Sequence, residues 1–577
     1  MSLAGSNTVG AAPTRDPRLA HARSWLLPAV FITILGGAWF CSIGLRSLIS
    51  PDEGRYATLS LGMLQSGDWI TPRLNGLLYF EKPVLQYWLG AIAFNFLGVS
   101  EFSARLWPAL AGFLTVLATG FTAARLWGRE SGLQALAICG SMTWILGNSL
   151  YLTLDAGLTL WLTIALCSVL LARRTEVSAK ESRNWILLAW VAIALAVLTK
   201  GLVGIVIPGA TLVLLCLWQR NWSWWRGMHW LPGLVLFLAI AAPWFIAVSS
   251  RNPGFAEFFF IHEHFARFLT KVHRREGAWW YYIPLLLAGA LPWTGLLAAL
   301  APRLWRDVFA PVKAVGEESL ESARVAQQRA LVAWSAFTFA FFSLSGSKLP
   351  SYILPMFPAL ALLMSIRARE LSASSMRWNL WILIGVWLLA VLVSTQAHRF
   401  AGPNSPVSVL EPMAHAIRMA AGIFAAGAAI AWFCLRQSRV TAAILSLALS
   451  HVLALVVVLG SHDSFGQLKS AEIPAKRLQS YIDAATPVFA VRSYDQTLPF
   501  YLRRNVVLVE YEDEFEMGQR LEPNKSIARL EDFLQRWSEL PKAAAYMTPA
   551  TWQELQQRRV PMRVVYQDPR RVVVVKP

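Results

Sequence analysis

The sequence predicts a mainly α-helical, polytopic membrane protein that ends in a small α/β domain. Hydrophobic residues make up 56% of the 577 residues and charged residues only 15%, whereas soluble proteins are about 25% charged. Many apolar runs have the length of about 20 residues that a helix needs to cross a hydrocarbon core about 30 Å thick. The alternating pattern of membrane β-barrel strands is missing, so these runs are expected to be helices.

Thirteen apolar runs are predicted to span the membrane. They are 25–45, 102–124, 131–152, 155–172, 184–200, 201–218, 229–249, 282–302, 328–346, 351–367, 378–396, 413–435 and 439–461. A fourteenth run, 84–99, is short and follows a polar segment that contains a proline. These features are typical of an interfacial or re-entrant helix.

The distribution of basic residues supports this choice. If 84–99 does not cross, the basic short loops all fall on one side, which the positive-inside rule assigns to the cytoplasm. If it crosses, the first half of this bias is inverted. The sequence therefore predicts thirteen spans and an exterior C-terminus. The basic residues that decide this are Arg15, Arg23, Arg125, Arg129, Arg173, Arg174, Lys180, Arg183, Arg220, Arg226, Arg303, Arg306, Arg367, Arg369, Arg377, Arg436 and Arg439.

Three parts follow along the chain. Residues 1–23 form a cytoplasmic tail, and 24–462 form the membrane domain with exterior loops 46–101 and 250–281. In 463–577, valine-rich runs alternate with helical patterns, which predicts an α/β domain on the outer face.

Charge and cysteine usage limit the partners. The net charge of +18 is explained by basic cytoplasmic loops and a phosphate-bearing partner, so nucleic acid is not expected. The five cysteines lie singly in apolar segments without metal-ligand spacing. Membrane lipids are expected partners, and no obligate protein partner is indicated.

Five polar features share the predicted exterior side. The first is the segment 50–56, where Asp52, Glu53 and Arg55 follow the first span. Adjacent carboxylates at a bilayer boundary are costly unless they face water, a cation or a polar substrate. An ordinary turn with solvated charges is the alternative. The other four features are 77–83 with Tyr79, Glu81 and Lys82; Asp155; 251–281 with His262, His264, Arg267 and the basic run 271–275; and 345–352 with Lys348 and Tyr352.

Each of these features also has a structural explanation. Asp155 also suits a helix N-cap, Lys348 suits a snorkelling position at a helix end, and the basic run 271–275 suits a solvated face. His262 and His264 diverge on a helix, so they are weak grounds for a metal site. Five such features around one exterior cavity nevertheless favour a shared site.

Carboxylates and cations at a lipid–water boundary indicate a particular chemistry. Arginine and lysine suit a phosphate whose lipid tail stays in the bilayer, and a carboxylate can act as base or orient a nucleophile. The chain has neither a P-loop nor a glycine-rich dinucleotide fingerprint, so the activated donor is expected to be lipid-linked.

Four motifs resemble those of a known family: Asp52-Glu53-Gly54-Arg55-Tyr56, Tyr79-Phe80-Glu81-Lys82-Pro83, Glu263-His264 with Arg267-Phe268, and Lys348-Leu349-Pro350-Ser351-Tyr352-Ile353-Leu354-Pro355. Over about 40–460 the chain resembles the aminoarabinose transferases of lipid A modification. These belong to the GT-C class, which includes protein O-mannosyltransferases. The resemblance implies a thirteen-span GT-C glycosyltransferase fold with interfacial helices in the first exterior loop.

The resemblance also implies an activity. This is transfer of 4-amino-4-deoxy-L-arabinose from undecaprenyl phosphate to lipid A phosphates at the periplasmic face of the bacterial inner membrane, which gives resistance to polymyxin and other cationic peptides. The implied catalytic residues are Asp52 and Asp155. The implied substrate-binding residues are Arg55, Tyr79, Lys82, Arg267, Lys348 and Tyr352. Glu81 and His264 are implied ligands of a divalent metal such as zinc, with His262 as the competing ligand.

Two alternatives remain at this point. A GT-C transferase of another polyprenyl-phosphate sugar, such as a protein O-mannosyltransferase, would show similar exterior charges. A transporter of a lipid-linked substrate usually places polar groups near the bilayer midplane, on broken helices. Here the charges lie at span ends, which disfavours the transporter.

Overall fold

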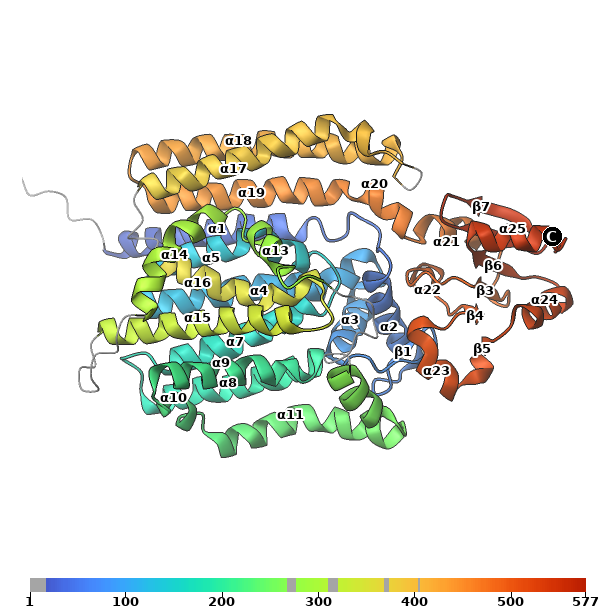
Figure 1. Cartoon of the computed structure of the whole chain (residues 1–577), viewed down its shortest axis with the longest axis horizontal. Coiled ribbons are helices and arrows are strands. Elements are labelled where there is room, and N and C mark those ends of the chain that lie inside the picture. Colours follow the sequence, from blue (N-terminus) through green and yellow to red (C-terminus); the bar gives the residue numbers. More distant parts are fainter. Residues whose placement is uncertain (1–16, 267–276, 310–319, 368–372, 403–404) are drawn as a thin grey trace, which may run out of the picture.

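A bundle of long helices forms most of the molecule, and an α/β domain of C-terminal residues lies at one end of it (Figure 1). The structure is a computed structural model that describes residues 17–266, 277–309, 320–367, 373–402 and 405–577. The bundle helices run along one common direction, as expected for segments that cross a membrane.

Most of the helical residues lie in the bundle. Its helices are α1 (Pro17–Phe40), α4 (Glu101–Trp127), α5 (Arg129–Ser141), α6 (Thr143–Ser149), α7 (Asp155–Ala172), α8 (Ala179–Lys200), α9 (Val203–Gln219), α11 (Trp230–Arg251), α13 (Tyr282–Gly289), α14 (Thr294–Phe309), α15 (Leu320–Leu344), α16 (Phe357–Arg367), α17 (Ala373–Thr395), α18 (Val407–Arg436) and α19 (Val440–Ser461). Shorter helices connect them: α10 (Ser223–Arg226), the π-helix η1 (Glu257–Ala266), the 3₁₀ helices η2 (Pro350–Met356) and η4 (Ala397–Phe400), α20 (Asp463–Gly466) and η5 (Gln467–Lys469).

All thirteen predicted ranges contain helix, but thirteen spans are not confirmed. Among the described residues, eight helices are long and apolar enough to cross a membrane, or nine if the bent pair α13–α14 is one span. That pair is bent by 109°, and 131–152 is interrupted at Met142 between α5 and α6. Leu26–Phe40 of α1 and the whole of α9 are apolar but only 10–17 residues long.

Helices α2 (Asp52–Ser66) and α3 (Leu85–Leu97) lie across the end of the bundle beside the C-terminal domain, not along it (Figure 1). The 13 residues of α3 extend about 20 Å, which is too short for a hydrocarbon core of about 30 Å. This agrees with the prediction that 84–99 does not cross. A two-stranded antiparallel ribbon, β1 (Arg73–Leu74) and β2 (Leu77–Leu78), connects the two helices.

The C-terminal residues form the predicted α/β arrangement. A six-stranded sheet has the order β5-β4-β3-β6-β8-β7, and its first four strands are parallel. The central valine-rich strands are buried on both faces, as is typical when helices cover a sheet. The strands are β3 (Val488–Val491), β4 (Val507–Val509), β5 (Ser526–Ile527), β6 (Ala544–Met547), β7 (Arg563–Gln567) and β8 (Val572–Val575), and the helices are α21 (Glu472–Gln479), α22 (Leu498–Leu502), η6 (Asp513–Phe515), α23 (Glu516–Leu521), η7 (Pro523–Lys525), α24 (Leu530–Glu539) and α25 (Pro549–Gln557).

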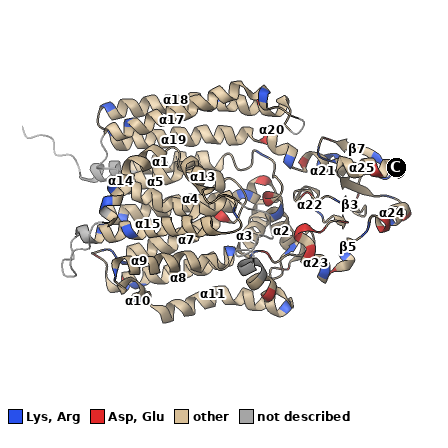
Figure 2. Ribbon diagram, in the orientation of Figure 1, with Lys and Arg blue, Asp and Glu red and all other residues tan. Residues whose placement is uncertain are grey.

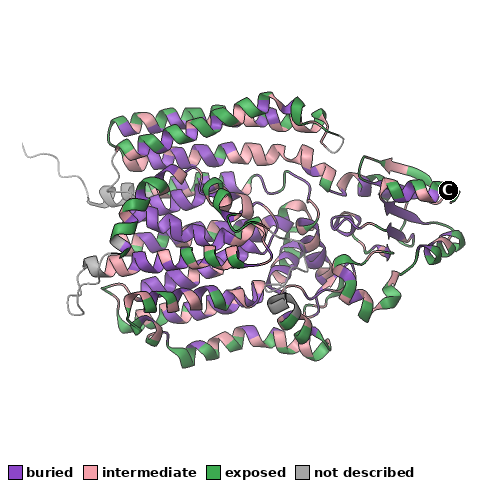
Figure 3. Cartoon of the chain, viewed as in Figure 1, coloured by how far each residue is buried: buried purple, intermediate pink, exposed green. Residues whose placement is uncertain are grey.

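Burial distinguishes the inner helices of the bundle from the outer ones, and charge distinguishes its two ends. Helix α7 is central, with 89% of its apolar window buried, whereas 22% of the window of α11 and 28% of that of α17 are buried, and the outer helices expose much of their surface (Figure 3). Figure 2 shows lysine and arginine at the bundle end away from the C-terminal domain, and acidic residues toward that domain. This pattern agrees with the predicted positive-inside bias.

Candidate active site

Glu53 is the centre of a fully buried ion-pair network, the Glu53 node. The guanidinium of Arg105 on α4 donates to both carboxylate oxygens at 2.7 and 2.8 Å, and Arg46 donates to both at 3.2 Å. The backbone N–H groups of Ile49 and Leu152 also donate, at 3.1 Å. Burial alone raises the pKa of Glu53, but the two arginines and these hydrogen bonds lower it to about 2. Glu53 therefore fixes the loop after α1 and is not available to a substrate.

Asp52, its neighbour, has a different environment. It begins α2, and its side chain is 34% exposed. Arg55 lies one turn later on the same helix, and its Nη1 is 2.9 Å from Asp52 Oδ1. The Nε of Arg55 donates to Glu514, which belongs to the C-terminal domain. Arg55 therefore connects an accessible carboxylate to a buried one, and its charge is shared between them.

The C-terminal domain contacts this loop closely. Gln496 donates from Nε2 to Glu514 at 2.8 Å and accepts from Ser50, and its backbone carbonyl accepts from Thr58 at 3.0 Å. A Cβ on Gly54 would lie 2.5 Å from the carbonyl carbon of Gln496, so only glycine permits this approach. The glycine next to the two carboxylates is thus explained by docking of the C-terminal domain.

Asp155 forms a second cluster at the start of α7. Its carboxylate accepts from the Nζ of Lys200, the last residue of α8, and from Ser351 Oγ at 2.8 Å. The ammonium of Lys200 also lies 4.4 Å from the ring centre of Tyr352, a cation–π distance. Leu154, not Asp155, is at the N-cap position and makes no side-chain capping bond, so capping does not explain this aspartate.

Tyr56 connects the two clusters. Burial raises the pKa of this phenol, and the carboxylates of Asp52 and Asp155 both raise it further. Both charges therefore act on one buried ring of α2, although Asp52 and Asp155 are about a hundred residues apart in sequence. The hydrogen bond from Leu152, three residues before Asp155, to Glu53, the neighbour of Asp52, places the two segments at the same end of the bundle.

The remaining predicted substrate-binding residues in the described part of the chain are Tyr79, Lys82 and Lys348. Tyr79 is buried, and burial together with Glu81 raises its pKa while Arg55 opposes the increase, so it lies near Glu81 and Arg55. Lys82 donates to the backbone carbonyl of Glu81 at 2.6 Å. Lys348 donates to the carbonyl of Ser345 at 2.8 Å, next to η2.

Part of the predicted metal and phosphate site cannot be placed. Arg267 and the basic run 271–275 lie outside the described residues, and His262 and His264 are described only as part of the π-helix η1. Among the described side chains, no group of three or more His, Cys, Asp or Glu residues is arranged to hold a metal ion.

The sequence reasoning missed several contributors, namely Arg46, Arg105, Lys200, Gln496 and Glu514. Arg105 and Lys200 are ionisable residues inside predicted spans, and such residues are functional candidates by default, so this signal was present. Glu514 had no sequence signal, because nothing in a surface-like acidic stretch indicates that it packs against Arg55. Only the docking of the C-terminal domain reveals it.

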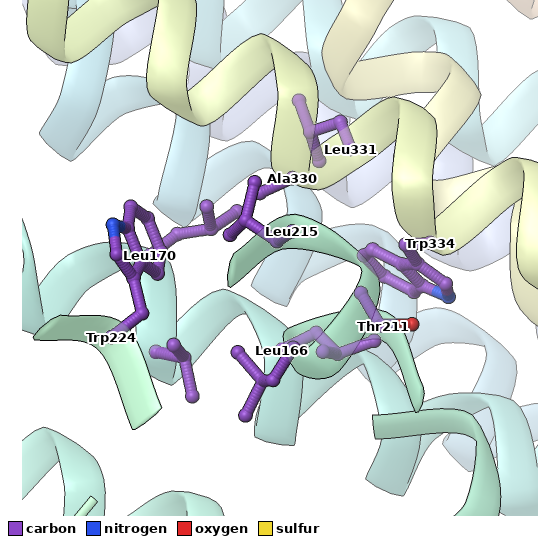
Figure 4. A pocket seen from close by; sticks show the side chains of 10 residues that line it. Leu166, Leu170, Thr211, Leu215, Trp224, Ala330, Leu331 and Trp334 are labelled. Atoms are coloured by element: carbon purple, nitrogen blue, oxygen red, sulfur yellow. The ribbon is translucent and has the colours of Figure 1, made fainter. Parts of the chain in front are cut away.

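One apolar pocket in the bundle is not part of this site. Leu166, Leu170, Thr211, Leu215, Trp224 and Trp334 are among the residues that line it (Figure 4). Its volume is about 10 Å³, which is room for about one water molecule. It is a packing defect between helices and cannot accept a sugar or a lipid.

Two family models match the chain. The model of the dolichyl-phosphate-mannose-protein mannosyltransferases matches residues 24–259, and that of the aminoarabinose transferase C-terminal domain matches residues 473–576. The first match includes Asp52 and Asp155, and the second includes Gln496 and Glu514.

Curated relatives and solved structures agree with these matches. The chain is 32% identical to an undecaprenyl phosphate-alpha-4-amino-4-deoxy-L-arabinose arabinosyl transferase of Erwinia tasmaniensis over 65% of each chain, and 33% identical to that of Aeromonas salmonicida over 66% of this chain and 67% of the relative. The crystal structure of ArnT from Cupriavidus metallidurans bound to undecaprenyl phosphate is 34% identical and has a TM-score of 0.88, with 96% of this chain and 98% of that chain covered. The chain therefore belongs to the aminoarabinose transferase family of the GT-C class of membrane glycosyltransferases.

Proposed function

We propose that this protein transfers 4-amino-4-deoxy-L-arabinose from undecaprenyl phosphate to phosphate groups of lipid A. The observation that carries this proposal is the similarity along almost the whole chain to ArnT bound to undecaprenyl phosphate. The charged clusters around Asp52 and Asp155 support it, because they combine carboxylates with cations at one end of a membrane bundle.

The proposed orientation places the site at the periplasmic face of a bacterial inner membrane. The basic bundle end in Figure 2 is then cytoplasmic, as the positive-inside rule requires. Residues 1–23 would form a cytoplasmic tail, 24–462 the catalytic membrane domain and 463–577 a periplasmic domain. In this arrangement the periplasmic domain supplies Glu514 and Gln496 to the catalytic loop.

The proposed reaction is an inverting glycosyl transfer. A lipid A phosphate oxygen forms a bond to C1 of the amino sugar. The bond between C1 and the undecaprenyl phosphate oxygen breaks, and its electron pair remains on the leaving phosphate. Because the acceptor phosphate is already anionic, its orientation matters more than removal of a proton.

The residues would divide this work. Asp52, positioned by Arg55, orients the acceptor. Lys82, Arg267, Lys348 and Tyr352 stabilise the negative charge on the leaving phosphate, which is where preorganised donors lower the barrier most. Asp155 holds the ammonium of Lys200 against the ring of Tyr352. It would therefore position this positive charge near the leaving phosphate. No step of this proposal requires a metal at Glu81.

The product explains a physiological role. An amino sugar on a lipid A phosphate adds a positive charge where a negative charge was exposed. This lowers the surface attraction for cationic peptides such as polymyxin, and resistance to them is the expected phenotype.

A reconstituted assay tests the proposal. Purified protein is supplied with undecaprenyl phosphate aminoarabinose and lipid A, and the lipid A mass is followed. Protein with Asp52→Asn and a reaction with undecaprenyl phosphate mannose and a hydroxyl-bearing peptide are the controls. An increase in lipid A mass supports the proposal. Transfer only to the peptide would indicate the mannosyltransferase alternative, and lipid movement without transfer would indicate a transporter.

A further inference from the structure

A second cavity lies where the membrane bundle meets the C-terminal domain. Its volume is about 320 Å³, and none of the predicted site residues lines it. The start of α4 forms one wall, and α21 together with the end of α22 forms the other. The lining residues are Glu101, Glu472, Lys476, Gln479, Tyr501 and Arg503.

The charged groups of this cavity are two acids and two bases. Lys476 Nζ lies 2.6 Å from Glu472 Oε1. The hydrogen bond to Glu472 raises the pKa of Lys476, and Glu101 adds to this increase. Partial burial lowers the pKa of Arg503, and Glu101 opposes that decrease. Glu101 therefore acts on both bases, and the cavity presents positive and negative groups together.

Apolar side chains are exposed beside the cavity. Arg503 donates to the carbonyl of Val99 at 2.7 Å, which fixes it on the turn between α3 and α4. On both sides of this turn, Phe96 is 79% exposed, Leu97 55% and Phe102 41%. Large apolar side chains exposed at the end of a membrane bundle are typical of contact with lipid. A ligand of this cavity would therefore be amphiphilic.

We propose that this cavity binds the headgroup of a lipid that carries a phosphodiester and a primary ammonium. Lys476 and Arg503 would bind the phosphate oxygens, and Glu101 and Glu472 the ammonium. The acyl chains would lie along Phe96, Leu97 and Phe102. An ethanolamine phospholipid has this chemistry.

The cavity also borders the catalytic loop. The hydroxyl of Tyr501 accepts from the backbone N–H of Leu48 at 2.8 Å. On the opposite wall, Glu101 lies one turn before Arg105, which holds Glu53. A bound lipid would thus contact Tyr501, which holds Leu48, and the start of α4, which carries Arg105. Both groups support the segment that leads to Asp52.

Native mass spectrometry of the full-length protein in detergent tests this site. Phosphatidylethanolamine, its N-acetylated form and phosphatidylglycerol are titrated separately. The wild-type protein is expected to bind phosphatidylethanolamine about tenfold more tightly than the two lipids without an ammonium. Lys476→Gln is expected to weaken that binding about tenfold, and Glu101→Gln with Glu472→Gln to abolish the preference for the ammonium.

Lys542→Gln is the matched control, because Lys542 is 70% exposed and pairs with Asp483, as Lys476 is 69% exposed and pairs with Glu472. It should leave binding unchanged. Undecaprenyl phosphate aminoarabinose is titrated separately against wild type and Lys476→Gln, and a fall in its affinity without a fall for phosphatidylethanolamine would overturn the proposal. Equal binding of all three phospholipids, or no effect of Lys476→Gln on any lipid, would overturn the proposal. Sugar transfer is not part of this readout, so the site stands or fails independently of the proposed reaction.

Discussion

The Glu53 node and the Asp52 loop are adjacent in sequence but differ in almost every physical respect. Glu53 is fully buried and accepts from two arginines and two backbone N–H groups. Asp52 is partly exposed and pairs with one arginine, whose charge is shared with Glu514. A pair of carboxylates at a membrane boundary can therefore combine two functions. One carboxylate fixes the loop, and the other remains accessible for chemistry.

The largest expected effect comes from Glu53→Gln. It leaves Arg46 and Arg105 buried without a compensating charge, which typically costs about 3–5 kcal/mol. We expect a strongly lowered melting temperature in detergent and poor recovery of folded protein. A normal melting temperature would show that the node does not hold the loop.

The pH dependence of stability gives a control for this change. The pKa of Glu53 is lowered from its usual 4.5 to about 2 in the folded protein, so its stabilisation is complete above pH 4.5 and is lost as the pH falls toward 2. The wild type should lose stability over this window, and Glu53→Gln should lose less. Identical curves would contradict the assigned pKa.

Asp52→Asn should separate chemistry from folding. The melting temperature should change little, because the side chain is partly exposed and its amide form still accepts from Arg55. The transfer rate should fall about 100-fold, near the lower end for acid–base residues, because the acceptor is already ionised. A loss of several thousandfold with donor binding retained would instead indicate a general base.

Gly54→Ala tests the contact between the loop and the C-terminal domain. The added Cβ would lie 2.5 Å from the backbone of Gln496, so the domain must shift, at a cost of about 1–3 kcal/mol. Both the melting temperature and the transfer rate should decrease. Gly147→Ala is a matched control, because its Cβ would meet nothing within 4 Å.

Glu514→Gln should have the smallest effect. It keeps the hydrogen bond with Gln496 but removes the charge that holds Arg55, so the transfer rate should fall about tenfold, equivalent to about 1.4 kcal/mol. Arg55→Lys should cause only part of this tenfold loss in the transfer rate. An unchanged rate in Glu514→Gln would show that the domain does not position Arg55.

The sequence was sufficient for the fold class, but not for the environments of the candidate site residues. Periodicity and charge bias predicted the helical bundle, the short run 84–99 and the valine-rich strands. They could not distinguish Asp52 from Glu53, because burial depends on where Arg105 of α4 is placed by packing. Lys200 and Glu514 acquire their roles from contacts with residues 45 and 459 positions away, which no local pattern encodes.

In the proposed mechanism, Asp52 and Asp155 serve one site. The most direct test is a double-mutant cycle that measures the transfer rate of Asp52→Asn, Asp155→Asn and the double variant with undecaprenyl phosphate aminoarabinose and lipid A. Residues that act as a unit are strongly non-additive, so the double variant should be only slightly slower than the slower single variant. Losses that multiply, with each single variant still folded, would contradict a common site.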